Sequence, residues 1–304
     1  MADAIRPLRT LWRFGRPHTL IGTALSVLGI FAITADDLGG IPLGKAVLHV
    51  ALTLVAGLAV NVFITGINQI TDVEIDRINK PFLPIAAGEL SLPAARRIVA
   101  ASAVIPLVLA VTQGWIEVVA VAAALAIGWA YSCEPLRLKR FPVAASASIS
   151  VVRSFVVNLG VALHFTTAFG AGEHVPEAVW ALTLFVIPFS FAIAVLKDVP
   201  DMAGDSAFDV RTFTVRLGQR TAFGMGMAAL TLAYAGLAIL GPLFVESAQP
   251  VVLAVTQVAA LALVWWLAVR VDVTDQAAFT RFYMRVWGLF FLEYVLVPVA
   301  VLAQ

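Results

Sequence analysis

Nine long apolar runs occupy most of this 304-residue chain and constrain its fold more than any other feature. Hydrophobic residues make up 61% of the sequence, charged residues make up 13%, and the mean hydropathy is +0.95. A soluble domain contains about half apolar and about a quarter charged residues. A helix of about 20 apolar residues is long enough to cross the hydrocarbon core of a bilayer. The sequence therefore predicts an all-α membrane protein, a bundle of nine transmembrane helices.

The runs predict a single membrane domain over residues 1–304, in which residues 1–17 form an amphipathic arm before the first span. The expected spans are residues 18–34, 47–69, 96–112, 115–132, 143–165, 178–197, 221–240, 249–270 and 282–301. The third of them is short and contains Pro106, which is unfavourable in a helix interior. The single cysteine, Cys133, leaves no partner for an internal disulfide and too few thiols for a cysteine-based metal site. None of these patterns indicates an oligomeric state.

Basic residues lie almost entirely on one side of the nine-span arrangement. Of the 20 Lys and Arg residues, 18 fall in the N-terminal arm or in the loops that follow the even-numbered spans. Lys45 falls on the opposite side, and Arg153 lies inside the fifth span. Because cytoplasmic loops of membrane proteins are enriched in Lys and Arg, the basic side is expected to face the cytoplasm. The arm is then cytoplasmic and the C-terminus lies on the other side.

Two acidic segments interrupt the apolar chain, and both fall on the basic side. They read Asn-Gln-Ile-Thr-Asp-Val-Glu-Ile-Asp at residues 68–76 and Lys-Asp-Val-Pro-Asp-Met-Ala-Gly-Asp at residues 197–205. A carboxylate near hydrocarbon costs on the order of 3 kcal/mol even on lenient scales. We therefore expect these segments to be compensated by a water-filled cavity, a basic partner or a divalent cation.

Each acidic segment carries its polar residues at helical spacing. The positions are Asn68, Asp72 and Asp76 in the first segment and Asp198, Asp201 and Asp205 in the second. If the preceding helix continues, the first three share one helical face, and so do the second three. Pro200 is expected to kink the second helix and to leave the carbonyl of Leu196 without its helical partner.

Two carboxylate stripes on facing helices predict an oxygen-only site. Hard oxygen ligands suit Mg²⁺, which binds carboxylates together with water and phosphate oxygens. Nearby basic residues would neutralise a polyanion, and they are Arg77, Lys80, Lys197 and Arg211. The combination indicates a diphosphate site at a membrane surface. The alternative is that both segments are ordinary polar loops, which explains neither the spacing nor the presence of two similar patterns.

The residues around the acidic segments resemble those of UbiA-type intramembrane prenyltransferases. The paired motifs of that superfamily are similar to Asn68-x3-Asp72-x3-Asp76 with Asn79-Lys80-Pro81, and to Lys197-Asp198-x2-Asp201-x3-Asp205. Further similarity, closest to the homogentisate prenyltransferase branch, lies in residues 14–23, 79–89, 131–142 and 153–165. The resemblance runs in order from residue 12 to residue 218. Glu134 and Phe213 depart from the pattern of the branch, in which a proline and an aliphatic residue are more typical.

The resemblance implies a helical bundle whose central cavity opens to the cytoplasmic face and sideways to lipid. It implies Mg²⁺ as the cofactor, a prenyl diphosphate as the donor and homogentisate as the aromatic acceptor. The implied reaction transfers a phytyl or geranylgeranyl group with loss of CO₂ from the acceptor, as in tocopherol and plastoquinone synthesis. The implied location is a bacterial inner membrane or a thylakoid-type membrane, with the lipid bilayer and small molecules rather than nucleic acid as partners.

The resemblance also carries roles for individual residues. The expected Mg²⁺ ligands and catalytic residues are Asp72, Asp76, Asp201 and Asp205. Arg153 is expected to be catalytic and to pair with the acceptor's carboxylate, since an arginine inside an apolar run is costly unless it faces a cavity or a carboxylate. The expected substrate-binding residues are Asn68, Lys80, Asp198, Arg16, Tyr131, Arg137, Lys139 and Arg211. For the basic residues the alternative is a purely topological charge, and His18 and His164 are given no role.

Other functions remain open from the sequence. The acidic motifs do not distinguish homogentisate from 4-hydroxybenzoate, naphthoate or chlorophyllide as the acceptor. A cation-coupled transporter is a second class, but transporter sites lie near the bilayer midplane on broken helices, whereas these acids lie at helix ends. Prenyl chain length depends on the depth of the cavity, which periodicity does not give.

Overall fold

Helices make up the regular structure in the computed structural model, which describes residues 2–208 and 210–304. Nine of the described helical segments are long and apolar enough to cross a bilayer, which confirms the predicted number. They are α2 (Pro17–Asp37), α3 (Leu43–Thr71), α5 (Leu92–Gln113), α6 (Trp115–Ser132), the fifth span (Pro142–Ala168), α9 (Glu177–Leu196), α12 (Gln219–Phe244), α13 (Pro250–Ala268) and α14 (Gln276–Leu302). The fifth span joins α7 (Pro142–Val151), the π-helical segment η2 (Val152–Leu159) and α8 (Gly160–Ala168).

The third and ninth spans begin earlier than the sequence predicts, and their caps explain the difference. The Ser91 hydroxyl accepts a hydrogen bond from the backbone N–H of Ala94 just before α5 begins. The Asp275 carboxylate accepts bonds from the N–H groups of Ala277 and Ala278 at the start of α14. Such caps satisfy N–H groups that have no partner in the first turn of a helix. Each helix therefore begins before its predicted span, with an apolar first turn in α5 and a more polar one in α14.

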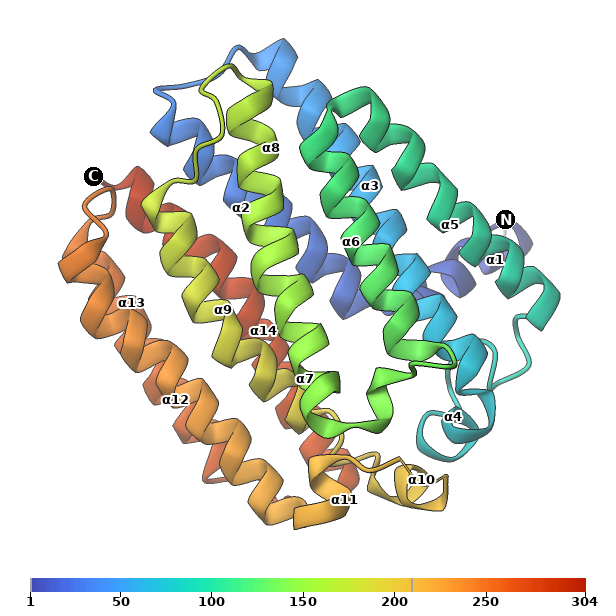
Figure 1. The fold of residues 1–304 in the computed structure, drawn as a ribbon. Helices are drawn as coiled ribbons and strands as arrows, with labels where there is room; N and C mark the ends of the chain where they lie inside the picture. Colours follow the sequence, from blue (N-terminus) through green and yellow to red (C-terminus); the bar gives the residue numbers. More distant parts are fainter. Residues whose placement is uncertain (1, 209) are drawn as a thin grey trace.

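Short helices gather at one end of the bundle. They are α4 (Val73–Asn79), the 3₁₀ turn η1 (Leu138–Arg140), α10 (Met202–Ala207) and α11 (Phe213–Leu217). All belong to the basic loops that follow even-numbered spans, and Figure 1 shows α4, α10 and α11 at the same end. At the opposite end, residues 38–42, 169–176 and 245–249 connect spans without any helix. The two ends of the bundle therefore differ, and the acidic segments lie at the end that bears the short helices.

Two apolar cores hold the spans together. The larger core unites α2, α8, α9, α12, α13 and α14, and includes the buried rings of Phe165, Phe189 and Trp287. The smaller core unites α3, α5 and α6 around Phe63 and Phe14. Because lipid tails are as apolar as these side chains, the cores hold the spans together through van der Waals packing rather than through transfer out of water. The bundle is thus two packed groups of helices, and α9 and α14 are the most buried spans.

The N-terminal arm contains helix α1 (Ala2–Phe14). Leu8 and Trp12 are exposed, whereas Phe14 is fully buried in the smaller core. Gln69 near the end of α3 donates a hydrogen bond of 2.7 Å to the Phe14 carbonyl. The arm is therefore attached to the helix that leads into the first acidic segment. Residue 1 and the side chains of residues 2–6, which also fall in the predicted arm, lie outside the described part of the chain.

A close approach of α2 to α14 at Gly29 yields a prediction about stability. A Cβ at this position would lie 2.5 Å from the backbone carbonyl oxygen of Tyr294, so one helix must move. We expect Gly29→Ala to destabilise the protein by about 1–3 kcal/mol, the usual cost of overpacking. Gly236 of α12 has no atom within 4 Å of such a Cβ, and Gly236→Ala is the matched control. Thermal unfolding in detergent should show a lower Tm for Gly29→Ala only, and equal Tm values for the two variants would contradict the expectation.

Candidate active site

A cavity of about 270 Å³ lies between α2, α3, α6, the fifth span, α9 and α14, which confirms the predicted central cavity. Apolar residues such as Val60, Ile64 and Val121 line much of its wall. The polar residues at the end that bears the short helices are Arg16, Asn68, Tyr131 and Lys197. The opposite end is lined by Thr53 and Glu117. The cavity therefore has a charged mouth and a long apolar interior.

The first acidic segment continues α3 with a break. α3 ends at Thr71, and Asp72 has φ −115° and ψ 19° before α4 begins. The N–H of Asp72 still donates to the Asn68 carbonyl at 3.0 Å, and the N–H of Asp76 donates to the Asp72 carbonyl at 2.7 Å. The helix is interrupted at Asp72, whereas the predicted spacing assumed a continuous helix. The hydrogen bonds between residues four positions apart nevertheless continue across the break. Asn68 Nδ2 consequently donates to Asp72 Oδ2 at 3.1 Å.

The second acidic segment is a turn between α9 and α10. α9 ends at Leu196, as expected for a helix approaching Pro200. The Leu196 carbonyl is paired, contrary to the prediction, because the chain tightens and Val199 N–H donates to it at 3.3 Å. Asp201 N–H likewise donates to the Asp198 carbonyl at 3.2 Å. The turn takes the place of the kinked helix that the sequence suggested.

Asn79 and Lys80 join the two acidic segments. Lys80 Nζ forms an ion pair with Asp201 Oδ2. Asn79 Nδ2 donates to Asp205 Oδ1 at 3.3 Å, and Asn79 Oδ1 accepts a bond of 2.9 Å from the N–H of Gly204. A Cβ at Gly204 would lie 2.4 Å from Asn79 Oδ1, so only glycine fits this contact. Residues separated by 126 positions in the sequence thus form one structure.

Burial raises the pKa of three carboxyl groups in these segments. Burial raises the pKa of Asp76 to about 6 and that of Asp198 to about 6. Burial, with the neighbouring Asp198 and Asp201 carboxylates, raises the pKa of Asp205 to about 8. Both desolvation and repulsion between carboxylates favour the protonated form. A cation in contact with these groups would favour their charged form.

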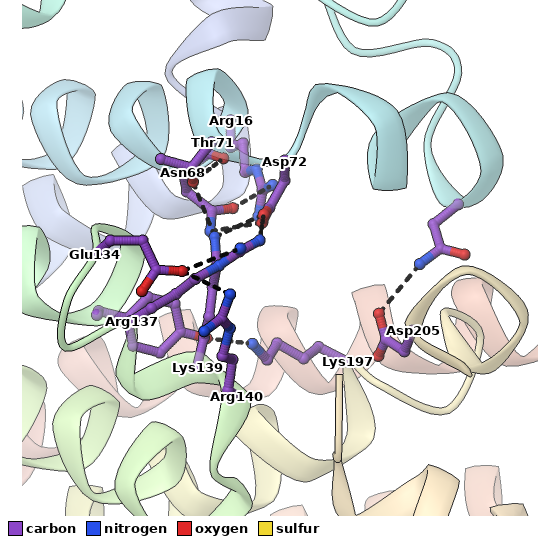
Figure 2. A network of polar contacts seen from close by, with 12 residues as sticks. Arg16, Asn68, Thr71, Asp72, Glu134, Arg137, Lys139, Arg140, Lys197 and Asp205 are labelled. Atoms are coloured by element: carbon purple, nitrogen blue, oxygen red, sulfur yellow. Dashed lines mark hydrogen bonds and ion pairs between the residues drawn. The ribbon is translucent and has the colours of Figure 1, made fainter. Parts of the chain in front are cut away.

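Basic groups surround Asp72 and Asn68, as Figure 2 shows. Lys139 Nζ lies 2.7 Å from Asp72 Oδ1, and an Arg137 nitrogen lies 3.4 Å from the same oxygen. Arg16 donates a hydrogen bond of 3.3 Å to Asn68 Oδ1. Burial lowers the pKa of Lys139, while the adjacent Asp72 acts in the opposite direction. The structure therefore brings three of the predicted diphosphate residues to the first acidic segment.

Arg16 and Arg137 also share a backbone feature. They are the non-glycine residues with positive φ in the described chain, at 56° and 34°. This region costs roughly 1–2 kcal/mol for a residue with a Cβ. Such conformations cluster at functional sites, where the surrounding structure maintains them. The feature supports both arginines as parts of the site beyond their charge.

Lys197 was predicted only as a nearby basic residue that neutralises a polyanion, and it was not included among the substrate-binding residues. Its Nζ donates a hydrogen bond of 2.7 Å to the Tyr131 hydroxyl and lies 3.6 Å from Asp198 Oδ1. Both Lys197 and Tyr131 line the cavity mouth. Asn61, one heptad before Asn68 on α3, was also missed; it lines the cavity and donates to the Gly15 carbonyl at 3.0 Å. Their positions at helical spacing from motif residues were the available signal.

Arg153 faces the cavity from the π-helical segment of the fifth span. Its guanidinium carbon lies 4.6 Å from the centre of the Trp287 ring and 5.7 Å from that of Phe290. No ion pair with a carboxylate is formed within the described residues, and one guanidinium nitrogen is buried without a hydrogen-bond partner. π-Helical turns are rare and often mark functional positions. The arrangement leaves a positive charge available to an anion in the cavity.

Arg211, His18 and His164 do not take part in the contacts described above. Arg211 is exposed and does not line the cavity. His18 lines the cavity with its ring centre 4.9 Å from that of Trp287. His164 is buried near the opposite end, with Nδ1 3.8 Å from a Glu117 oxygen. Lys80, Arg137, Lys139 and Asp198 do not line the cavity either, but they are buried or half-buried in the contacts of the acidic segments. Arg211 is therefore the predicted substrate-binding residue for which this arrangement offers least support.

The carboxylates suit a hard divalent cation that is shared with a ligand. Within the described chain, no three His, Cys, Asp or Glu side chains lie close enough to hold a metal ion by themselves. Asp76 Oδ2 is nevertheless buried without a hydrogen-bond partner, as expected of an oxygen that awaits a cation. Protein sites for Mg²⁺ often supply one or two carboxylates and leave the other positions to phosphate oxygens and water. The donor set fits that pattern.

Comparison with known proteins agrees with this geometry. Residues 19–289 match the model of the UbiA prenyltransferase family. The chain is 40% identical to a homogentisate phytyltransferase of Synechocystis sp., over 96% of each chain. It is 36% identical to homogentisate phytyltransferase 1 of Arabidopsis thaliana, over 96% of this chain and 75% of that protein.

Solved structures share the fold. A UbiA homologue from Archaeoglobus fulgidus, bound to DMAPP and Mg²⁺, aligns with a TM-score of 0.67 at 19% identity, over 95% of this chain and 99% of that one. An apo UbiA homologue from Aeropyrum pernix aligns with a TM-score of 0.63 at 20% identity, over 94% and 98% of the two chains. The chain therefore belongs to the UbiA prenyltransferase family and is an integral membrane enzyme that crosses the bilayer several times.

Proposed function

We propose that this enzyme transfers a phytyl or geranylgeranyl group from its diphosphate to homogentisate, with loss of CO₂ from the acceptor. The observation that carries the proposal is Arg153, a guanidinium without a carboxylate partner inside the cavity, facing the same space as the charged mouth. Relatives at 40% and 36% identity are named as homogentisate phytyltransferases, and others as homogentisate geranylgeranyltransferase and solanesyltransferase. An anionic acceptor and an anionic leaving group need separate cationic positions, and the cavity provides them.

The diphosphate is proposed to bind at the cavity mouth. Its candidate cationic contacts are Arg16, Lys80, Arg137, Lys139 and Lys197. Without substrate, several of these cations are already in contact with motif carboxylates, as Lys139 is with Asp72 and Lys80 is with Asp201. Because charge-assisted hydrogen bonds are stronger than neutral ones, the same cations are able to hold phosphate oxygens when the carboxylates bind a metal. Asn68, Asp198 and Tyr131 extend this set of polar groups at the mouth.

Mg²⁺ is proposed to be held by Asp72 and Asp76 in the first segment and by Asp201 and Asp205 in the second. When bound, it would offset the charge that develops on the departing diphosphate. The raised pKa values of Asp76 and Asp205 reflect carboxylates held in a desolvated place at close quarters, where a divalent cation relieves the repulsion. Asn79 and Gly204 keep the two segments together, so that carboxylates of both face one ligand.

The apolar interior is proposed to hold the prenyl chain and to protect the reacting carbon. The bond between the allylic carbon and the diphosphate oxygen breaks, and a ring carbon of the acceptor forms the new bond. The ring proton leaves, and the acetate side chain of homogentisate loses CO₂ and gains a proton, which yields a methyl-bearing prenyl quinol. Val60, Ile64 and Val121 exclude water from this space.

Arg153 is proposed to position the acceptor through its carboxylate. A guanidinium binds a carboxylate with two parallel hydrogen bonds, which fixes orientation as well as position. The rings of Trp287 and Phe290 pack against the guanidinium, so it is oriented before the acceptor binds. A 4-hydroxybenzoate or naphthoate acceptor also carries a carboxylate, and Arg153 alone does not distinguish these acceptors from homogentisate.

The whole chain is proposed to act as one membrane domain with its mouth towards the cytoplasm. The basic loops support this orientation through the positive-inside rule. The arm, residues 1–17, then lies on the cytoplasmic side, next to the first acidic segment that it contacts. A bacterial inner membrane or a thylakoid-type membrane is the proposed location, in keeping with a cyanobacterial relative and chloroplast relatives.

The proposed reaction is tested with purified protein, Mg²⁺, phytyl or geranylgeranyl diphosphate and homogentisate labelled in its carboxyl group. We expect labelled CO₂ and a prenyl quinol in equal amounts, and neither product in excess EDTA. A parallel series with 4-hydroxybenzoate, dihydroxynaphthoate and chlorophyllide identifies the acceptor. Product from one of these and none from homogentisate would overturn the assignment of the acceptor, while leaving the prenyl transfer itself in place.

Glu74 in the first acidic segment provides a matched control for variants of the proposed metal ligands. Glu74 lies between Asp72 and Asp76 in the sequence, but its side chain is 63% exposed and pairs with Arg77. We expect Asp72→Asn and Asp76→Asn to lower kcat/KM about 100-fold or more, since each removes charge that stabilises the transition state through the metal. Glu74→Gln should change kcat/KM less than about twofold, as is usual for an exposed ion pair. A loss of similar size in all three variants would show that the segment does not act through one face.

Arg153 yields a prediction about substrate binding. A lost charge-assisted hydrogen bond costs roughly 1.5–3 kcal/mol, so Arg153→Gln should raise the KM for homogentisate about 10–100-fold. The KM for the prenyl diphosphate should change little, because the diphosphate contacts lie at the mouth. Steady-state kinetics with each substrate varied in turn make the measurement, and Arg153→Lys should recover part of the loss. Equal increases in both KM values would count against the proposed role.

A further inference from the structure

A second pocket lies at the basic end of the bundle, between the end of α13 and the start of α14. Its volume is about 250 Å³, and it is separate from the central cavity. The lining residues are Trp266, Leu267, Arg270, Val271, Ala278, Arg281, Phe282 and Arg285. Three arginines thus line a pocket whose other walls are almost wholly apolar.

The spacing of the α14 residues explains this convergence. Ala278, Arg281, Phe282 and Arg285 lie three, four and seven positions apart, so they share one helical face. Ala278 leaves the space between the two helices, and the buried ring of Phe282 forms part of the base. Just beyond the end of α13, Arg270 donates a hydrogen bond of 2.7 Å to the Trp266 carbonyl, and its guanidinium carbon lies 4.3 Å from the centre of the Trp266 ring. Arg270 is therefore held at the rim.

The charges of this pocket are not neutralised within the described chain, which leaves out residue 209. None of the three arginines forms an ion pair there. The two nearby acids of the connecting loop bind local donors instead: Asp272 accepts from Thr274 at 2.8 and 2.7 Å, and Asp275 accepts from Ala277 and Ala278 at 2.9 and 3.0 Å. The positive charges of the three guanidinium groups that line the pocket repel one another, so binding of an anion among them lowers the electrostatic energy.

The level of the pocket in the bilayer indicates which kind of anion binds there. α13 ends at Ala268 and α14 begins at Gln276, so the arginines lie where two spans leave the hydrocarbon. Trp266 and Val269, 52% and 72% exposed, place apolar surface beside the pocket on the side of the span. Tryptophan is typical of the headgroup level of a bilayer. A ligand here meets cations at one end and hydrocarbon at the other.

We propose that this pocket binds the phosphate of an anionic phospholipid, with Arg281 and Arg285 contacting the phosphate, Arg270 closing the rim and an acyl chain lying along Trp266 and Val269. The phosphodiester has two free oxygens, which match the paired N–H groups of a guanidinium. Basic pockets between membrane helices are suitable sites for such headgroups. Topological charge alone accounts for basic residues on this side, but it does not account for their convergence on a pocket with an apolar base.

The experiment is native mass spectrometry of the purified full-length protein with added phosphatidylglycerol or phosphatidylcholine. We expect one phosphatidylglycerol to be retained more tightly than phosphatidylcholine. Each arginine near an anionic headgroup is worth about 1 kcal/mol, so the double variant Arg281→Gln/Arg285→Gln should weaken retention about 30-fold. The matched control, Arg96→Gln/Arg97→Gln, removes two exposed arginines at the same end outside the pocket and should change retention less than twofold.

A second variant separates the pocket from general charge and does not depend on the folding of the first. Ala278→Phe fills the pocket and leaves all three arginines in place, so it should also abolish the preference for phosphatidylglycerol. Circular dichroism and the apparent Tm establish that each variant is folded. The proposal is overturned by equal retention of the two lipids in the wild type, by equal losses in the two double variants, or by full retention in Ala278→Phe. Displacement of the lipid by millimolar inorganic phosphate would likewise overturn it, because the site would then recognise free phosphate.

Discussion

The structure depends on keeping carboxylates at the edge of a hydrocarbon-embedded bundle. Aspartates of two distant loops lie together, and each would be costly there alone. The chain compensates them with cations drawn from two different loops, as Lys139 and Arg137 meet Asp72 and Lys80 meets Asp201. These contacts also join the loops at one end of the bundle, beside the mouth of the cavity. The same interactions therefore stabilise the fold and collect the charges that the proposed reaction needs.

The shape of the cavity follows from how the two cores are arranged around those loops. α3 and α6 belong to the smaller core and carry Asn68 and Tyr131 to the mouth, whereas α9 belongs to the larger core and carries Lys197 there. Each core buries its own apolar side chains, so the cavity between them can remain open without loss of packing elsewhere. The spans thus deliver Asn68 and Tyr131, and the loops and turns that follow the spans deliver most of the charged groups.

Local patterns in the sequence predicted the spans and the two acidic faces, because hydropathy and helical spacing act over short distances. The first turns of α5 and α14 were missed, because capping by Ser91 and Asp275 begins each helix before its predicted span. Contacts between distant residues had no local signal: the fit of Gly204 against Asn79 and the bond from Lys197 to Tyr131 arise only when the loops meet. Arg211 shows the converse, because it follows the second motif closely in the sequence and yet its side chain is exposed.

Separate parts of the chain carry the two halves of the proposed chemistry. In this proposal the loops at the mouth bind the diphosphate, and nothing in their carboxylates and cations depends on which ring receives the prenyl group. The fifth span is proposed to bind the acceptor, because its π-helical turn places Arg153 beside the aromatic side chains of α14. A change in this span can alter the acceptor while the diphosphate end stays intact. A UbiA fold is therefore able to serve several acceptors with a common mouth, and specificity for the ring is best sought around Arg153, Trp287 and Phe290.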